Sequence, residues 1–104
     1  EESSLLLKER EAPEGLLGSV CDSECLGETY ENGDVSLTVT EDFYGGDGAE
    51  DADEDTVVDS LHRATVANLV GEETVRVAIE AGVVDEETVL DLEGTLHAQL
   101  LWLR

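Results

Sequence analysis

Hydrophobic residues in the first forty positions follow the spacing of extended strands separated by turns. Residues 5–10 predict a strand that begins in the core and emerges into solvent, and residues 16–21 return as its partner after a turn that contains Pro and Gly. Asn32-Gly33 is a strong turn signal. Residues 35–40 then alternate apolar and hydroxyl side chains, which predicts a half-buried strand with Val35, Leu37 and Val39 facing the core.

The hydrophobic period changes from that of a strand to that of a helix after Asp53. Acidic residues fill the first turn, and Val57, Leu61 and Ala64 follow at helical spacing. Residues 68–70 fit either the end of this helix or a short buried strand, and the pattern leaves both readings open. A second helix begins after Gly71, with acidic residues in its first turn, and is expected to end at Gly82.

The remaining apolar segments again favour extended structure. They are residues 83–84, 89–92 and 96–103, with a hairpin turn at 93–95. Strands, then two helices, then strands indicate an α+β domain, in which a small mixed or antiparallel sheet carries both helices on one face. Asp22 is suited to cap a single turn that ends near Gly27.

The length of 104 residues allows one domain, because a chain of this size encloses a single core. Within it, residues 45–52 contain three glycines and no large apolar side chain, which predicts an acidic, Gly-rich mobile loop. The apolar C-terminal stretch at residues 100–103 is compatible with a central strand or with an edge used in a homodimer.

The charge of the chain indicates the kind of solvent in which the protein folds. It has 27 Asp and Glu against 5 Lys and Arg, for a formal net charge of -22, while 40% of its residues are hydrophobic. This combination indicates a folded protein adapted to concentrated salt, in which screening suppresses self-repulsion, rather than a disordered acidic tail. We therefore expect a halophilic protein of the cytoplasm, without a membrane span, whose surface binds salt cations weakly. The same screening allows even an acidic protein to bind RNA.

Two acidic or glycine-rich segments do not meet the requirements of known sites. Asp51, Asp53 and Asp55 match the start of a calcium loop, but Thr56 and His62 occupy the positions that need Gly and Glu. Gly45-Gly46 lacks the Lys-Ser/Thr pair of a phosphate-binding loop. We therefore expect no cofactor.

The cysteines and histidines leave a zinc site as a minor alternative to ordinary reduced thiols. Cys21 and Cys25 are four positions apart, and the chain has two histidines, His62 and His97. These four side chains are ligands that zinc accepts, although only the cysteines approach the spacing of a structural site. An intracellular chain favours the reduced thiols.

Two short segments stand out as candidates for recognition. His97 and Gln99 would point to the same face of a strand, where they could bind a ligand or form an ordinary exposed polar pair. Phe43-Tyr44 precedes the Gly-rich loop, where the two aromatic residues serve either as core anchors or as part of a recognition surface.

Several segments, taken in order, resemble the small archaeal family known as domain of unknown function 424. The resemblance rests on residues 16–22, 26–28, 41–46, 67–72 and 97–99, and it covers nearly the whole chain from Leu5 to Trp102. The acidic loop and Cys25 depart from the family pattern. The positions that the resemblance carries over are Phe43, Tyr44, Gly45, Gly46, Asn68, Gly71, His97 and Gln99.

The family has no assigned activity, so the resemblance implies a binding or accessory module without stating its partner. We expect a protein or RNA partner, with a link to RNA or translation, bound by Phe43, Tyr44, Gly45, Gly46, Asn68, His97 and Gln99. The alternative is a small enzyme in which His97 acts as general acid or base and Asn68 orients the substrate.

Overall fold

A six-stranded sheet forms the centre of the molecule in the computed structural model, which describes residues 5–13, 15–40, 44, 49–92 and 94–101. The strands lie in the order β5-β1-β2-β6-β8-β7, and a separate hairpin pairs β3 with β4. Strands β2 and β6 are parallel, and the other pairs of the sheet are antiparallel. The strands are β1 (Leu5–Ala12), β2 (Gly15–Asp22), β3 (Thr29–Asn32), β4 (Val35–Thr38), β5 (Ala49–Ala52), β6 (Val66–Val70), β7 (Leu90–Leu92) and β8 (Thr95–Leu101).

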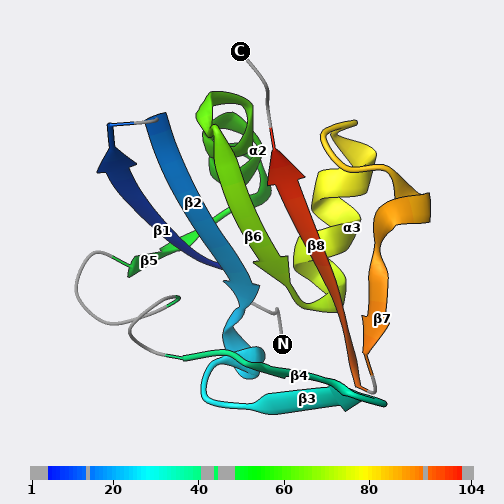
Figure 1. Cartoon of the computed structure of the whole chain (residues 1–104). Helices are drawn as coiled ribbons and strands as arrows, with labels where there is room; N and C mark the ends of the chain where they lie inside the picture. The colour runs from blue at the N-terminus through cyan, green and yellow to red at the C-terminus, as the bar shows by residue number, and fades with distance from the viewer. Residues whose placement is uncertain (1–4, 14, 41–43, 45–48, 93, 102–104) are drawn as a thin grey trace.

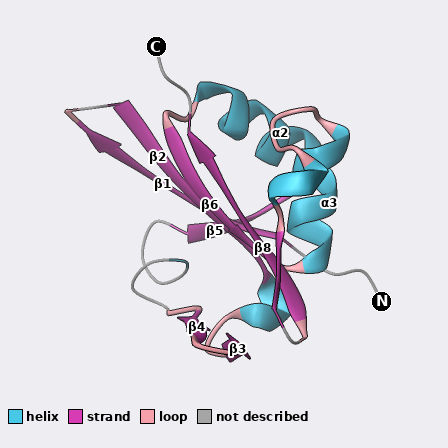
Figure 2. Cartoon of the chain, turned by 45° about the vertical axis from the view of Figure 1, so that its right-hand side comes forward, coloured by secondary structure: helices cyan, strands magenta, loops and turns pink. Residues whose placement is uncertain are grey.

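Both α-helices with several turns pack on one face of this sheet, as Figures 1 and 2 show. They are α2 (Glu54–Arg63) and α3 (Glu72–Glu80), and the described residues also contain two short 3-10 turns, η1 (Ser23–Cys25) and η2 (Glu86–Thr88). This arrangement confirms the predicted α+β class with a mixed sheet and two helices on one side. None of the helices in the described residues is long and apolar enough to span a membrane.

The main hydrophobic core lies between the helices and the sheet. Val57 and Leu61 of α2 and Val75 and Ala78 of α3 are fully buried against the sheet residues that point the same way. Those sheet residues are Leu5, Leu7, Val20, Ala67, Leu69, Ala98 and Leu100. Because side chains of a strand alternate between faces, the intervening residues of the central strands must lie on the opposite face, which α2 and α3 do not cover and which we call the helix-free face.

A second, smaller core covers one end of that helix-free face. Cys21 and Val70 of the sheet pack there with Cys25, Val39 and Tyr44, and with half-buried residues of the β3–β4 hairpin. The hairpin turns at Gly33, as the Asn-Gly signal predicts. Leu37 is half-buried and Val39 fully buried, while Ser36, Thr38 and Thr40 are exposed, which confirms the alternation of this segment; the side chain of Val35 lies outside the description.

Three segments of the chain have a structure that the sequence left open or predicted wrongly. Residues 68–70 belong to strand β6 rather than to a helix, because they pair with both β2 and β8. Residues 83–84 form a bend instead of a strand. The predicted loop at 45–52 is wrong for its second half, because Ala49–Ala52 is strand β5, which pairs with residues 5–8 of β1; residues 45–48 lie outside the described residues. Backbone pairing to an available edge outweighs low intrinsic strand propensity there.

Asp22 also has a role that differs from the prediction. It precedes η1, but its side chain does not cap that turn. Its carboxylate instead accepts hydrogen bonds from the backbone amides of Glu73 and Thr74 and from the Thr74 hydroxyl, so it caps α3 across the fold. Gly71 allows this approach, since a Cβ atom there would lie 2.4 Å from the Asp22 carboxyl carbon and its φ is +118°.

Candidate functional site

The helix-free face of the sheet presents two rows of side chains that cross its four central strands. Strand register aligns Lys8, Ser19, Asn68 and Gln99 in one row, which we call the polar row. The next row aligns Arg10, Leu17, Val66 and Leu101, which we call the apolar row. With strands about 4.8 Å apart, each row spans roughly 14 Å.

The most exposed side chains of the two rows lie on β8 and at Arg10 of β1. Gln99 and Arg10 are exposed, Lys8, Leu17, Val66 and Asn68 are half-buried, and Ser19 is buried. Leu101 is 63% exposed. A small hollow of about 20 Å³ lies between Lys8, Arg10, Leu17 and Ser19.

Two hydrogen bonds fix the polar groups on the β6–β8 side. The Gln99 side chain donates from Nε2 to Asn68 Oδ1 at 2.9 Å. His97, two residues before Gln99 on the same face, has its Nδ1 3.0 Å from the Leu69 carbonyl oxygen. Since a carbonyl can only accept, Nδ1 carries the proton of this hydrogen bond, and a ring with one proton then has Nε2 as an acceptor.

The charge that the four central strands place on this face is opposite in sign to the net charge of the chain. Strands β1, β2, β6 and β8 place no Asp or Glu on the helix-free face, although they place Lys8 and Arg10 there. The acidic residues of β1 point to the other side, where Glu9 accepts from Ser60 and pairs with Arg63 at 3.0 Å. Asp51 of the edge strand β5 lies opposite Leu6, next to this area.

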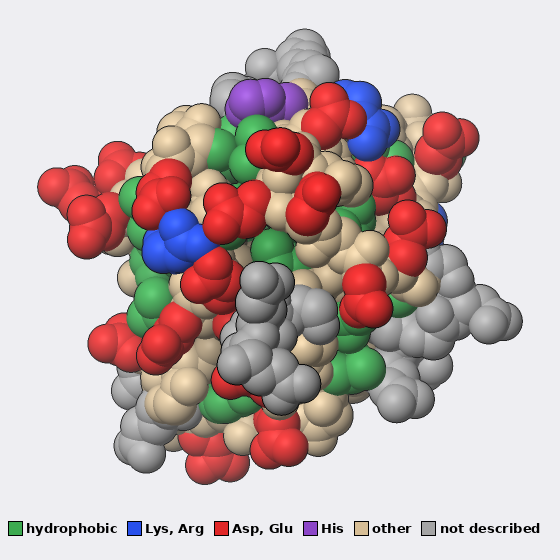
Figure 3. Space-filling view, turned by 180° about the vertical axis from the view of Figure 1, so that it is seen from behind, with side chains coloured by type: hydrophobic (Ala, Val, Ile, Leu, Met, Phe, Trp, Pro, Cys, Tyr) green, Lys and Arg blue, Asp and Glu red, His purple; other side chains and the backbone are tan. Residues whose placement is uncertain are grey.

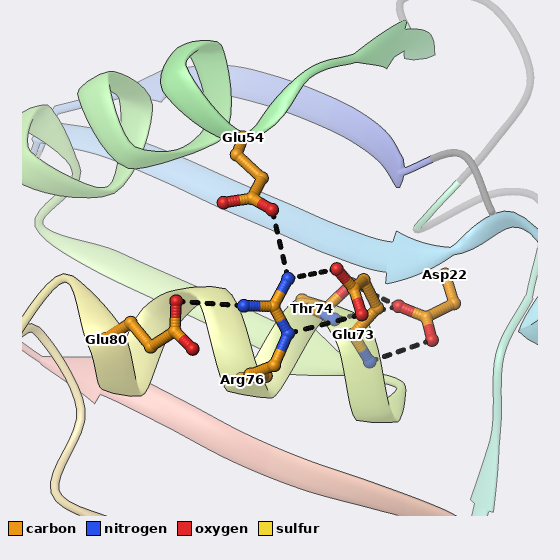
Figure 4. A network of polar contacts seen from close by, with 6 residues as sticks. All are labelled: Asp22, Glu54, Glu73, Thr74, Arg76 and Glu80. Carbon is orange, nitrogen blue, oxygen red and sulfur yellow. Dashed lines mark hydrogen bonds and ion pairs between the residues drawn. The ribbon is translucent and has the colours of Figure 1, made fainter. Parts of the chain in front are cut away.

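The helix-covered face, in contrast, is densely acidic. Figure 3 shows Asp and Glu side chains spread over this side of the molecule, with few Lys or Arg among them. Arg76 of α3 lies among three carboxylates and pairs with Glu54, Glu73 and Glu80 (Figure 4). The hydrogen bonds that the guanidinium donates to Glu73, Glu80 and Glu54 hold its pKa above its usual value.

A cleft of about 330 Å³ opens beside the N-terminus of α3. Its walls carry four carboxylates and four smaller or aromatic groups, namely Asp22, Glu24, Glu72, Glu73, Cys25, Tyr30, Gly94 and Thr95. Asp22 is only 5% exposed and accepts three hydrogen bonds from α3, while Glu73 pairs with Arg76 (Figure 4). Two of the four carboxylates therefore hold the helix in place.

The two cysteines lie in the smaller core rather than at the surface. Both are free thiols, and Cys25 Sγ is 3.8 Å from the Thr95 hydroxyl. Burial, followed by the nearby Cys25 and Asp22, raises the pKa of Cys21 to about 12, and burial also raises the pKa of Cys25. Thiols in this state are poor nucleophiles and poor metal ligands.

Comparison with known proteins identifies the chain at the level of its family. A family model described as "Protein of unknown function (DUF424)" matches residues 9–103. The chain belongs to this family. A crystal structure of an uncharacterized conserved protein from Methanopyrus kandleri has the same fold, with a TM-score of 0.74 and 21% sequence identity over 97% of this chain and 96% of that one. No curated protein matches.

The structure of this DUF424 protein brings together three of the residues that the sequence singled out. Asn68, His97 and Gln99 lie on the helix-free face, on the neighbouring strands β6 and β8. Tyr44 lies at the covered end of the same face but is not available at the surface, because it is 3% exposed and anchors the smaller core, where burial and the nearby Cys21 raise its pKa to about 12. Phe43, Gly45 and Gly46 lie outside the described residues.

The four side chains of the zinc alternative are not brought together. Cys21 and Cys25 share the smaller core, but His62 is exposed on α2, on the other side of the sheet from His97. In the part of the chain that the structure describes, no group of three or more His, Cys, Asp or Glu could hold a metal ion. The spacing of two cysteines in sequence does not decide where the histidines fold.

His97 and Asn68, the two residues of the enzymatic alternative, lie on the same face of the sheet. His97 is opposite Val70 and Asn68 is opposite Gln99, so the two are diagonal neighbours across β6 and β8. The Asn68 amide oxygen, however, is engaged by Gln99. An acid-base role for His97 therefore stays a prediction.

Lys8, Arg10 and Ser19 are the site residues that sequence reasoning missed. The sequence did contain a signal for the two cations. Lys8 and Arg10 are two positions apart in a strand, so their side chains share a face, while those of Glu9 and Glu11 lie on the other face. Ser19 carried no such signal, because only the β1–β2 register places it beside Lys8.

Proposed function

We propose that this DUF424 protein is a binding module that holds single-stranded RNA on the helix-free face of its sheet. The observation that carries the proposal is the distribution of charge. On a chain with a net charge of -22, the four central strands leave this face without a carboxylate and place Lys8 and Arg10 on it. Cations on a surface that is otherwise acidic favour a ligand that carries phosphates.

The polar row supports RNA over a simple anion. Ser19, Asn68 and Gln99 offer hydroxyl and amide groups beside Lys8, and His97 adds an imidazole acceptor. Such groups can bond to the edges of unstacked bases and to ribose hydroxyls. An open sheet face suits a single strand, since the deep major groove of an RNA duplex is not accessible to side chains.

The apolar row supplies contacts that do not depend on salt. We expect the protein to work in concentrated salt, where the Debye length is about 3 Å and phosphate contacts alone hold RNA weakly. Leu17, Val66 and the 63% exposed Leu101 can cover the faces of bases or riboses there. The helix-covered face offers the same ligand mainly carboxylates in place of such contacts, which favours the helix-free face for binding.

The test compares two arginines that differ in the face they occupy. Arg10→Gln removes a cation from the helix-free face, and Arg63→Gln removes one from α2, where the Arg63 side chain is 53% exposed. Binding of a fluorescein-labelled 12-nucleotide RNA of mixed sequence is measured by anisotropy from 0.5 to 2 M KCl. Loss of one phosphate contact on a single strand lowers the salt slope by about 0.7.

We expect Arg10→Gln to weaken binding about 3- to 10-fold and Arg63→Gln to leave it within about 2-fold. Thermal unfolding of both variants in the same salt checks that they are folded. Absence of RNA binding by the wild-type chain, or an equal loss in both variants, would overturn the proposal. Capture of a protein by the same face without RNA would also count against it.

A further inference from the structure

The amide pair formed by Asn68 and Gln99 has a chemical pattern that reaches beyond general binding. The two residues lie directly opposite each other on β6 and β8, and their side chains are joined by a hydrogen bond of 2.9 Å between Gln99 Nε2 and Asn68 Oδ1. Gln99 is exposed and Asn68 is half-buried. The bond therefore holds two amides side by side at the surface.

This bond leaves a donor group and an acceptor next to each other. Each primary amide has an NH₂ group with two donors and an oxygen with two lone pairs. After the mutual bond, the Asn68 NH₂ group and the Gln99 oxygen keep their capacity to bind a ligand. If both amides rotate together, the order reverses, but one donor group and one acceptor still lie side by side.

A nucleobase edge is the complement of that pattern. Each base presents neighbouring donors and acceptors on the edge used for pairing, and Asn and Gln commonly bind such edges through two bonds. We infer that Asn68 and Gln99 form a reading pair that binds the edge of one unstacked base and sets a base preference. This inference rests on the RNA-binding function proposed above.

The residues beside the pair are placed to contact other parts of the same nucleotide. Lys8 lies on β1, two strand spacings or roughly 10 Å from Asn68, a distance comparable to that from the phosphate to the far edge of the base within one nucleotide. His97, with Nδ1 bonded to the Leu69 carbonyl, adds a fixed acceptor beside Gln99. The cations thus bind the backbone of the RNA, and the amide pair binds a base.

The experiment measures base preference rather than affinity alone. Ten-nucleotide homopolymers of A, C and U, each with a fluorescein label, are titrated with the wild-type chain, Asn68→Ala, Gln99→Ala and Arg10→Gln in the same molar salt. Gln99→Ala is the sharpest variant, because its side chain is exposed and its loss leaves the core unchanged. Thermal unfolding confirms that each variant is folded.

We expect the wild-type chain to prefer one homopolymer over another by about 10-fold, in line with the discrimination of a pair of hydrogen bonds. Asn68→Ala and Gln99→Ala should reduce that preference to within about 3-fold, while Arg10→Gln should weaken all three homopolymers by the same factor. A merely structural amide pair would not change the preference.

The outcomes separate this inference from the proposed function. Binding of all three homopolymers with equal affinity by the wild-type chain, or an unchanged preference in Gln99→Ala, would overturn the reading pair and leave RNA binding in place. Absence of binding to every homopolymer would overturn the proposed function, and the reading pair with it.

Discussion

The two faces of the central sheet differ in what covers them and in their charge. One face packs against α2 and α3, and its outer surface carries carboxylates that surround the few cations, as Arg76 shows. Among the described residues, the smaller core covers one end of the other face, and the four central strands carry Lys8 and Arg10 there without an acidic residue. We propose that the acidity of the chain is an adaptation to concentrated salt, whereas the part of the surface that departs from that acidity marks the candidate site.

The largest effect that would test this comparison is the loss of the fold in dilute salt. Lowering KCl from 2 M to 0.05 M lengthens the screening distance severalfold, so repulsion among the carboxylates of the helix-covered face should unfold the domain. Far-UV circular dichroism follows the change. Replacement of the exposed acids Asp55 and Glu72 by Asn and Gln should lower the salt required. A fold that persists unchanged at 0.05 M would contradict our reading of the charge.

Adjacent leucines on β8 offer the most direct comparison of the two faces. Leu100 is 5% exposed and lies in the main core, while Leu101 is 63% exposed on the helix-free face. Leu100→Ala should lower the free energy of unfolding by about 3 kcal/mol, because it leaves a cavity. Leu101→Ala should change it by less than about 0.5 kcal/mol and weaken RNA binding instead. Urea unfolding at constant molar salt measures both; equal losses would mean that the helix-free face is covered.

Asp22 links the end of β2 to the helix-covered face, and its loss should have a smaller but clear effect. Asp22→Ala removes three hydrogen bonds from the start of α3 and leaves buried donors without a partner. We expect a loss of about 2 kcal/mol in the free energy of unfolding. Glu24→Ala, in the same cleft but exposed, is the matched control and should be neutral. RNA binding should persist in both variants, measured while they are folded.

The smallest effect concerns the end of the helix-free face that the smaller core covers. Burial raises the pKa of Cys21 from an ordinary value of 9.0 to about 12, so at pH 8 its thiolate should be scarce in the folded protein. We expect a thiol reagent to label the native chain at least about 100-fold more slowly than the unfolded chain. Fast labelling in the native state would show that the hairpin does not close this end.

The same pKa shift predicts the direction of a pH effect on stability. The folded state holds the Cys21 proton more tightly than the unfolded state does, so the stability present below about pH 9 should decline as the pH rises toward 12. Thermal unfolding as a function of pH checks this, with Cys21→Ala as the control that should lose part of the decline.

Local patterns were enough to predict most of the elements. Helix α3 follows from acidic residues after Gly71, apolar residues at helical spacing and Gly82 beyond its end, and the Asn32-Gly33 turn follows from its own chemistry. Residues 68–70 were ambiguous, because a short apolar run fits a buried strand or a helix equally well. Strand β5 was missed, because its sequence has no strand pattern and the edge of β1 supplies its hydrogen bonds.

The candidate site was predicted only in part, and for a related reason. His97 and Gln99 could be placed on one face from their spacing, but Tyr44 could be a core anchor or a surface residue until its surroundings were known. Asp22 reads as the cap of the turn that follows it, yet it caps a helix 51 positions away. Contacts of this kind depend on which elements meet.

Periodicity, turn chemistry and composition act over short distances along the chain, so they were enough to predict most of the strands and helices, the α+β class and the dominance of negative charge. The tertiary structure alone decided that Lys8, Ser19, Asn68 and Gln99 form one row, since strand order and register bring together residues that are far apart in sequence. It also decided that this row faces away from the helices. Side chains alternate between the faces of a strand, so a shift of one residue in the register would have buried the row and exposed the core.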